Sequence, residues 1–335
     1  MRGSPLVKTD SKAPNQFRFI VFDGRKGVAL YGVADGKLQE SHWLAQFSGF
    51  WYISGSNPAI SPNGRWIYLP MHADTAVIDL QERRLRWLGR ARRHPEGGYI
   101  SEVYRLCWSP DSRYLIGQEV EADRKLILCQ PLQTGYRVLV EDDVYGYGWY
   151  PDSQRIWYVQ RDAGGRFRWY RLELRSGRVE RLGAYEQRRV LSDWDLTLPP
   201  FRWMDVEVRR ILPEWTSLLV ISSTADRQVR VRVDPSDSSD SFERRLFIEW
   251  RSGRSVVVEA ADDIRKMFLW DLSADYRWAL VWCWEREDSR WHLVDLNRGR
   301  WKPLVFSEEV GRMLSPGAGG VIRADFKQSA RLLHG

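Results

Sequence analysis

The chain has 335 residues, of which 43% are hydrophobic, and 51 Lys and Arg stand against 44 Asp and Glu, giving a net charge of +7. The apolar content is enough for a globular core, but no apolar run approaches the roughly 18 residues that a transmembrane helix needs. No transmembrane segment is therefore predicted. The basic excess permits contact with an acidic partner, but acidic residues are dispersed among the basic ones, so nucleic acid is not the expected partner.

Residues 1–16 read as a polar, flexible tail. No signal peptide is predicted, because no apolar stretch of the required length follows Met1. Residues 1–4 resemble an expression-vector leader, which is compatible with removal of a native signal peptide. An odd number of cysteines favours buried free thiols on strands; the three are Cys107, Cys129 and Cys283. These features favour a cytoplasmic location and leave a periplasmic or extracellular one open.

A short phrase recurs along the chain, and residues 108–114 are its clearest copy. It reads as strand, tight turn and strand, because Pro presets φ in a turn and Asp or Asn can hydrogen-bond the backbone two residues on. Apolar residues on both sides suit strands. Further copies lie at residues 60–66, 149–153 and 272–278, and weaker ones at 211–215 and 314–317.

The spacing of these six copies predicts the architecture. Their third positions are residues 62, 110, 151, 213, 274 and 316, so the gaps between them are 48, 41, 62, 61 and 42 residues. A repeat of roughly 40–50 residues with strand patterning is typical of a propeller blade, and the longer gaps leave room for insertions. A second phrase, a strand followed by a polar turn and another strand, follows several copies. Each blade is therefore expected to hold four antiparallel strands.

The Ser-Pro-Asp/Asn-Ser/Gly-Arg phrase followed by an apolar strand resembles the repeats of TolB-like, WD-repeat-related propellers. The resemblance covers nearly the whole chain after residue 16 and departs from the pattern at Glu214, Ala274 and Gly317. We therefore predict an all-β fold, a six-bladed β-propeller forming a single domain over residues 17–335. Large aromatic residues on its strands are expected to pack between blades; these are Trp66, Trp108, Trp149, Trp157, Trp278 and Trp282.

The two ends of the chain are expected to share one blade, because neither end holds enough strands for a blade alone. Such joining removes a free sheet edge. Residues 17–23 and the hairpin 28–40 supply strands from the N-terminal side, and residues 313–315 and 321–325 supply strands from the C-terminal side. Both 17–23 and 321–325 compete for the second position in the sheet. The other blades are expected at residues 58–90, 103–140, 147–182, 206–259 and 268–304.

The resemblance implies that ligands meet the face formed by the loops that lead into each innermost strand, here termed the lead-in loops. These loops are rich in aromatic residues and Arg, the side chains that dominate interface hot spots. They are expected at residues 41–57, 90–102, 141–146, 183–205 and 259–267. The alternative is that the aromatic side chains fold back onto the blades. The candidate residues for binding a partner are Trp51, Tyr52, Arg93, His94, Tyr99, Tyr145, Arg189, Trp194, Trp203 and Asp263.

No motif for catalysis is found in the sequence. It lacks a Gly-x-Ser-x-Gly nucleophile elbow, a His-Glu-x-x-His zinc motif and a phosphate-binding loop. The series Asp234, Asp237, Asp240 and Glu243 fits no calcium-loop spacing and is typical of turns. No metal or cofactor is therefore predicted. A hydrolase would need paired carboxylates in the central mouth, such as Asp143 with Asp195 or Asp263.

The resulting prediction is a non-catalytic binding or scaffold propeller whose partner is a protein, bound through the aromatic and Arg-rich lead-in loops. One alternative is a propeller that binds a carbohydrate or another small ligand, since Trp and Tyr rings also stack on sugars. The other alternative is a hydrolase that uses carboxylates at the mouth of the central channel.

Overall fold

The described residues of the computed structural model are 14–23, 26–46, 59–70, 75–89, 92–93, 99–100, 104–118, 124–141, 143–192, 218–219, 229–233, 245–260, 264–273, 277–285, 289–314 and 321–326. They form six four-stranded antiparallel sheets, one two-stranded sheet and the helices α1 (Ala184–Ser192) and α3 (Glu308–Leu314). Neither of these helices is long and apolar enough to span a membrane.

Five of the four-stranded sheets take their strands consecutively from the chain. The first holds β4 (Ala59–Ile60), β5 (Trp66–Pro70), β6 (Thr75–Asp79) and β7 (Arg84–Gly89). The second holds β10 (Tyr104–Trp108), β11 (Leu115–Gln118), β12 (Leu126–Cys129) and β13 (Tyr136–Val140). The third holds β14 (Val144–Trp149), β15 (Arg155–Arg161), β16 (Phe167–Glu173) and β17 (Val179–Arg181).

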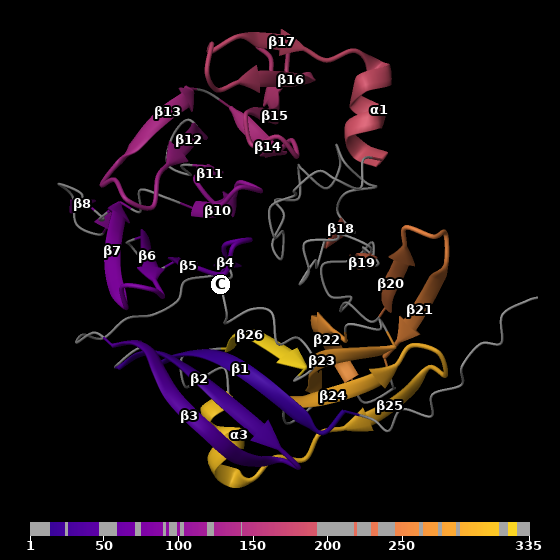
Figure 1. Ribbon diagram of the computed structural model, residues 1–335. Helices are drawn as coiled ribbons and strands as arrows, with labels where there is room; N and C mark the ends of the chain where they lie inside the picture. The colour runs from indigo at the N-terminus through magenta and orange to yellow at the C-terminus, as the bar shows by residue number, and fades with distance from the viewer. Residues whose placement is uncertain are drawn as a thin grey trace, which may run out of the picture.

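The fourth and fifth sheets follow the same order. The fourth holds β18 (Leu218–Leu219), β19 (Val229–Val233), β20 (Arg245–Trp250) and β21 (Ser255–Glu259), and the fifth holds β22 (Ile264–Leu272), β23 (Trp278–Glu285), β24 (Ser289–Asp295) and β25 (Arg300–Pro303). Figure 1 shows the sheets following one another around a common centre, with the first strand of each on the inside and the last on the outside.

The sixth sheet combines strands from both terminal regions. Its order is β26 (Val321–Phe326), β1 (Gln16–Asp23), β2 (Gly27–Ala34) and β3 (Lys37–Gln46). β26 pairs antiparallel with β1, with Phe19 opposite Ala324. The competition between residues 17–23 and 321–325 is thereby decided: β1 takes the second position and β26 the first.

One predicted strand is wrong. Residues 313–315 were expected to be extended, but residues up to Leu314 belong to helix α3. Ser307 caps this helix, since its hydroxyl oxygen accepts a hydrogen bond from the backbone N–H of Val310 at 3.4 Å. Val310 and Leu314, four residues apart, are buried on one face of the helix. The helix therefore covers the sixth sheet and adjoining core.

Hydrophobic cores fill the spaces between consecutive sheets. Alternate residues of one strand face opposite neighbours: Ile67 packs with residues of the sixth sheet, whereas Tyr68 packs with residues of the second. Sheets buried on both faces explain the nearly continuous apolar strands of this chain. The tryptophans expected in these cores are buried, with Trp149 and Trp157 fully inaccessible and Trp282 only partly buried.

The three cysteines are buried free thiols, as predicted. Cys107 lies in β10, Cys129 in β12 and Cys283 in β23. Burial raises the pKa of Cys129 to about 12, so that its thiol stays protonated at neutral pH and is a poor nucleophile.

The recurring phrase folds as a serine-anchored turn. In the second sheet, the backbone N–H of Ser109 donates to the carbonyl oxygen of Tyr114 at 2.8 Å, and the Ser109 hydroxyl oxygen accepts from the N–H of Tyr114 at 3.0 Å. The Ser109 hydroxyl donates to the Asp111 carboxylate at 2.6 Å. Ser61 and Ser273 hold Trp66 and Trp278 in the same way, at 2.9 Å in each case.

A second serine of the phrase links one sheet to the next. The Ser112 hydroxyl oxygen accepts a hydrogen bond from the backbone N–H of Asn63 in the first sheet's turn, at 3.0 Å. Ser153 accepts one from the N–H of Asp111 in the second sheet's turn, also at 3.0 Å. Both serines are buried, at 4% and 2% exposure. In the first sheet's turn, Gly64 stands at the position of Ser112 and Ser153. The neighbouring sixth sheet has no turn between its first two strands for a serine to bond, because β26 and β1 come from opposite ends of the chain.

We predict that Ser112→Ala and Ser153→Ala each lower the free energy of unfolding by about 1–2 kcal/mol, because each leaves a backbone N–H at a sheet–sheet junction without its acceptor. Denaturant unfolding followed by tryptophan fluorescence measures this loss. Ser176→Ala is the matched control, since Ser176 is exposed and its hydroxyl bonds only within its own turn, donating to the Glu173 carboxylate and accepting from the backbone N–H of Arg178. Equal stability of all three variants would contradict the role of the two buried serines.

Candidate functional site

Most of the predicted binding residues lie outside the described residues. These are Trp51, Tyr52, His94, Trp194, Trp203 and Asp263. The same holds for Asp195 and for the series from Asp234 to Glu243, so no separation between Asp143 and its proposed carboxylate partners is defined. Among the described residues, no group of three His, Cys, Asp or Glu side chains is placed to hold a metal ion.

Two predicted residues meet in a small hairpin. The loop expected at residues 90–102 contains β8 (Arg92–Arg93) and β9 (Tyr99–Ile100), which pair antiparallel. Arg93 lies directly opposite Tyr99 in the register. The sequence therefore placed both residues in the correct connection but missed its strands.

Tyr145 lies within β14 and not on a lead-in loop. It is only 7% exposed, because the Arg124 guanidinium lies 4.2 Å from its ring centroid and Phe167 makes an edge contact at 5.1 Å. Its hydroxyl donates to the Asp143 carboxylate at 3.4 Å. Tyr145 thus packs mainly within the third sheet and presents little surface to a partner.

Arg189 lies on helix α1, where the sequence predicted a loop over residues 183–205. The Glu186 carboxylate accepts a hydrogen bond from the backbone N–H of Gly183 at 2.7 Å. A side chain in the first turn thereby satisfies the N–H of the residue that precedes the helix, as in a capping box. Val190 is buried beneath the helix. A Gly followed three residues later by Glu was the signal for this helix start that sequence reasoning missed.

The outward face of α1 combines an aromatic ring with positive charge. Tyr185 is 72% exposed, more than any other aromatic residue that the structure describes. Arg188 and Arg189 are exposed and lie three and four residues after it, on the same side of the helix. This helix face is defined by Tyr185, Arg188 and Arg189, of which Arg189 is one of the predicted binding residues.

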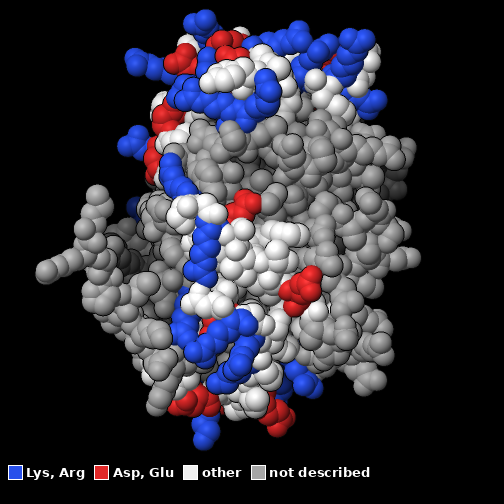
Figure 2. Space-filling view, turned by 90° about the vertical axis from the view of Figure 1, so that its right-hand side faces the viewer, with Lys and Arg blue, Asp and Glu red and all other residues white. Residues whose placement is uncertain are grey.

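Basic side chains also gather on the side of the molecule that includes α1 and the outer strands of the fourth and fifth sheets. Figure 2 shows Lys and Arg atoms forming a band along this side, with fewer Asp and Glu atoms. Exposed basic residues of these elements and their turns include Arg188, Arg251, Arg254, Arg298, Arg300 and Lys302. The Arg254 guanidinium donates to the Asn297 side chain, which joins the turns of the two sheets.

On the face formed by the serine-anchored turns, an arginine–aspartate pair recurs. In the first sheet, the Arg65 guanidinium donates to the buried Asp79 carboxylate at 2.6 Å and lies 4.6 Å from the ring centroid of Trp66. In the fifth sheet, Arg277 pairs with Asp295 at 3.4 Å and lies 5.2 Å from the Trp278 ring. The arginine thus covers an aromatic ring and neutralises a buried carboxylate.

The same pair is missing from the second sheet. Tyr114 stands where the first sheet has Trp66. Gln130 stands where that sheet has Asp79, since Asp79 pairs with Trp66 in the register and Gln130 lies opposite Tyr114, one residue beyond the Leu115–Cys129 pair. Without a carboxylate to hold it, Arg113 turns outward with a side chain 75% exposed and approaches only Asp111, at 3.8 Å. No guanidinium lies over the Tyr114 ring among the described residues.

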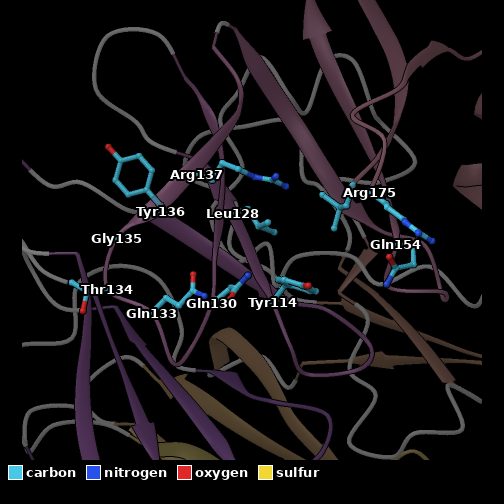
Figure 3. A pocket seen from close by; sticks show the side chains of 11 residues that line it. Tyr114, Leu128, Gln130, Gln133, Thr134, Gly135, Tyr136, Arg137, Gln154 and Arg175 are labelled. Atoms are coloured by element: carbon cyan, nitrogen blue, oxygen red, sulfur yellow. The ribbon is translucent and has the colours of Figure 1, made fainter.

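A pocket of about 450 Å³ opens at this place, between the second and third sheets. Its lining residues come from the serine-anchored turns and from the turns between third and fourth strands. In Figure 3 the Arg137 side chain extends toward the third sheet, where Gln154 and Arg175 lie, and the Tyr136 ring points away. The pocket is lined by Tyr114, Leu128, Gln130, Gln133, Thr134, Gly135, Tyr136, Arg137, Gln154, Leu174 and Arg175.

Five polar side chains that line this pocket are not engaged with the described part of the protein. Within the described part of the chain, the guanidinium groups of Arg137 and Arg175 and the side-chain amides of Gln130, Gln133 and Gln154 make no hydrogen bond or ion pair. The lining includes two guanidinium groups and no carboxylate. Sequence reasoning missed this pocket, because Gln and Arg in surface turns form no recognisable motif.

No protein-family profile matches the chain, and no curated protein matches it by sequence. Matching solved structures include TolB from Acinetobacter baumannii, with a TM-score of 0.47 and 11% identity, covering 93% of this chain and 66% of that one. A chain of the nidogen/laminin complex has a TM-score of 0.42 and 9% identity, covering 92% of this chain and 97% of that one. Hydrazine synthase from Kuenenia stuttgartiensis has a TM-score of 0.35 and 12% identity, covering 88% and 81%.

TolB and other β-propeller proteins are thus among the structural neighbours, which agrees with the TolB-like architecture predicted from the repeats. The present chain spans 66% of the length of the Acinetobacter TolB chain. At 9–12% identity, the likeness concerns the fold and conveys no activity, ligand or partner.

The recurring pair yields a pH-dependent prediction. Burial favours a raised pKa for Asp79, but the hydrogen bonds from Arg65, Glu82 and Gln81 outweigh it, so the pKa lies below its usual value. A carboxylate with a lowered folded-state pKa stabilises the fold above its unfolded-state pKa, and this stability is lost as pH falls through the folded-state value. We expect Asp79→Asn to lower the free energy of unfolding by about 1–3 kcal/mol at neutral pH.

The same variant should show a shallower loss of stability below about pH 4, where the native carboxylate becomes protonated. Urea unfolding between pH 3 and 7 measures both effects. Glu308→Gln is the control, because that carboxylate is 88% exposed and its pair with Arg312 spans 3.8 Å. A stability loss for Asp79→Asn that is the same at every pH would contradict the ionic role of Asp79.

Proposed function

We propose that the six sheets are the blades of a closed six-bladed β-propeller, and that the protein is a non-catalytic module that binds a protein partner through its lead-in loops. Three features support the architecture. The sheets follow one another around a centre, β26 pairs with β1, and the sixth sheet shares hydrophobic clusters with both the fifth and the first.

The helix face of α1 carries the binding proposal. Tyr185 exposes most of its ring to solvent, where a partner can cover it. Arg188 and Arg189 lie beside it. Tyr and Arg together are enriched where binding energy concentrates in protein interfaces. Trp51, Trp194 and Trp203, which lie outside the described residues, remain predicted binding residues of the lead-in loops.

The charge of this surface indicates the chemistry of the partner. The basic band around α1 favours a partner with Asp and Glu around an apolar patch, because complementary charges accelerate association and an apolar centre holds the complex. The net charge of +7 acts in the same direction.

We predict that Tyr185→Ala and Arg188→Glu each reduce recovery of the partner at least tenfold, since truncating a hot-spot side chain typically costs about 2 kcal/mol or more. The measurement is a quantitative pull-down from cells of the source organism, comparing the proteins held by each variant with those held by the unaltered chain. Arg83→Glu is the control, because Arg83 is an exposed arginine in the turn between β6 and β7. Unchanged recovery with both α1 variants would exclude this helix face.

A separate observation favours the small-ligand alternative. The pocket between the second and third sheets holds unengaged polar side chains in a volume within the range of small-molecule sites. This pocket and the α1 helix face are built from different residues, so a propeller can use one, the other or both.

A further inference from the structure

The pocket between the second and third sheets is a place where the chain departs from its own repeat. The first and fifth sheets fill the equivalent position with an arginine that covers a Trp ring and pairs with a buried Asp. The second sheet keeps Arg113 but has Gln130 in place of the acid. Replacing that acid removes the negative charge and uncovers the Tyr114 ring, which leaves space for another molecule.

The charge of the lining selects an anion. Arg137 and Arg175 contribute two guanidinium groups, and none of the eleven lining residues has a carboxylate. Within the described chain neither guanidinium has an ion-pair partner. Arginine binds carboxylates through parallel hydrogen bonds, so two guanidinium groups in the lining of one pocket favour a ligand that carries a carboxylate.

The neutral lining selects a ligand with many hydroxyl groups. The amides of Gln130, Gln133 and Gln154 and the hydroxyl of Thr134 can each both donate and accept hydrogen bonds. Hydroxyl groups of a ligand also do both, whereas a purely anionic ligand can only accept. Three amides in one pocket therefore fit a polyhydroxylated molecule better than a simple acid.

The apolar lining provides a surface for the ligand's body. The Tyr114 ring is packed on Trp149 at a centroid separation of 6.3 Å and an interplanar angle of 27°, which fixes its orientation. Leu128 and Leu174 add aliphatic surface. An aromatic ring held in this way can receive the C–H face of a pyranose, while the polar groups bind the rim of the sugar.

From these three features we propose that the pocket formed by Tyr114, Gln130, Arg137, Gln154 and Arg175 binds a sugar acid, a pyranose that carries a carboxylate. The carboxylate pairs with Arg137 and Arg175, the hydroxyls bond to the glutamine amides, and the ring lies on Tyr114. This assignment deepens the small-ligand alternative and does not depend on protein binding through α1.

The test uses the full chain with D-galacturonic and D-glucuronic acid as probes, by isothermal titration calorimetry and saturation-transfer NMR. D-Galactose is the neutral match, glutamate is a carboxylate without hydroxyls, and glucose 6-phosphate is a phosphate-bearing sugar. At least one uronic acid should bind at least tenfold more tightly than each of these three. No uronic acid binding at 10 mM, or equal binding of any comparator, overturns the proposal.

Variants assign the binding to this pocket. Arg137→Gln and Arg175→Gln should each weaken uronic acid binding about tenfold, as loss of a charge-assisted hydrogen bond predicts. Arg178→Gln, an exposed arginine close to Arg175 in the same connection but outside the lining, should stay within twofold. Unchanged affinity in both pocket variants overturns the assignment.

Gln130→Asp distinguishes loss of the binding site from misfolding. It restores the acid that the repeat has in the first and fifth sheets, so it is expected to fold and to keep or raise the unfolding temperature by pairing with Arg113. The new carboxylate should abolish uronic acid binding through repulsion and by drawing Arg113 into the pocket. Retained binding in a folded Gln130→Asp protein overturns the proposal. Tyr185→Ala should leave uronic acid binding intact, which separates this proposal from protein binding by α1.

Discussion

The sheets are held in sequence by one hydrogen bond that the chain makes twice among the described residues. A buried serine in the turn of one sheet accepts the backbone N–H from the turn of the sheet before it, as Ser112 does from Asn63 and Ser153 from Asp111. Both serines adopt positive φ angles, 63° and 56°, a conformation that costs energy for a residue with a side chain. The cost is offset because the hydroxyl then reaches across the junction. This geometry fixes the rotation between neighbouring sheets, and the large aromatic cores fill the space it leaves.

A scaffold fixed at its turns can tolerate exchange of side chains beside them, and the second sheet shows the result. The serine anchors of Ser109 and Ser112 remain, so the turn keeps its shape and its link to the first sheet. The arginine–aspartate pair next to them is lost through Gln130, and a pocket with unengaged amides and guanidinium groups takes its place. Function in such a fold resides in departures from the repeat, because positions that follow the repeat are already used to hold the sheets together.

The architecture could be predicted from sequence to the extent that local chemistry dictates it. The Ser-Pro-Asp-Ser phrase predicts its turn, because its polar residues bond locally: Ser109 bonds to Asp111 and Tyr114, and the N–H of Ser112 donates to the Ser109 carbonyl oxygen. The helices α1 and α3 were missed, because the caps at Gly183 and Ser307 are single residues that resemble turn signals. The pocket was missed for a different reason: it needs Gln130 of one sheet and Arg175 of the next, and only tertiary packing brings them together.

The α1 helix face and the pocket lie in different parts of the fold, and this difference bears on the kind of ligand that each suits. The α1 helix face belongs to a connection between sheets, where the chain can insert a helix without disturbing any hydrogen bond of the ladders, so exposed Tyr185 costs the fold little. The pocket is instead built partly from turns that also hold the sheets, so Tyr114 and Gln154 are positioned by the turns whose serines fix the architecture. A surface of the first kind suits recognition of a large partner, since a few exposed anchors suffice. A pre-formed pocket of the second kind suits a small ligand, because its polar groups are held in place before the ligand arrives.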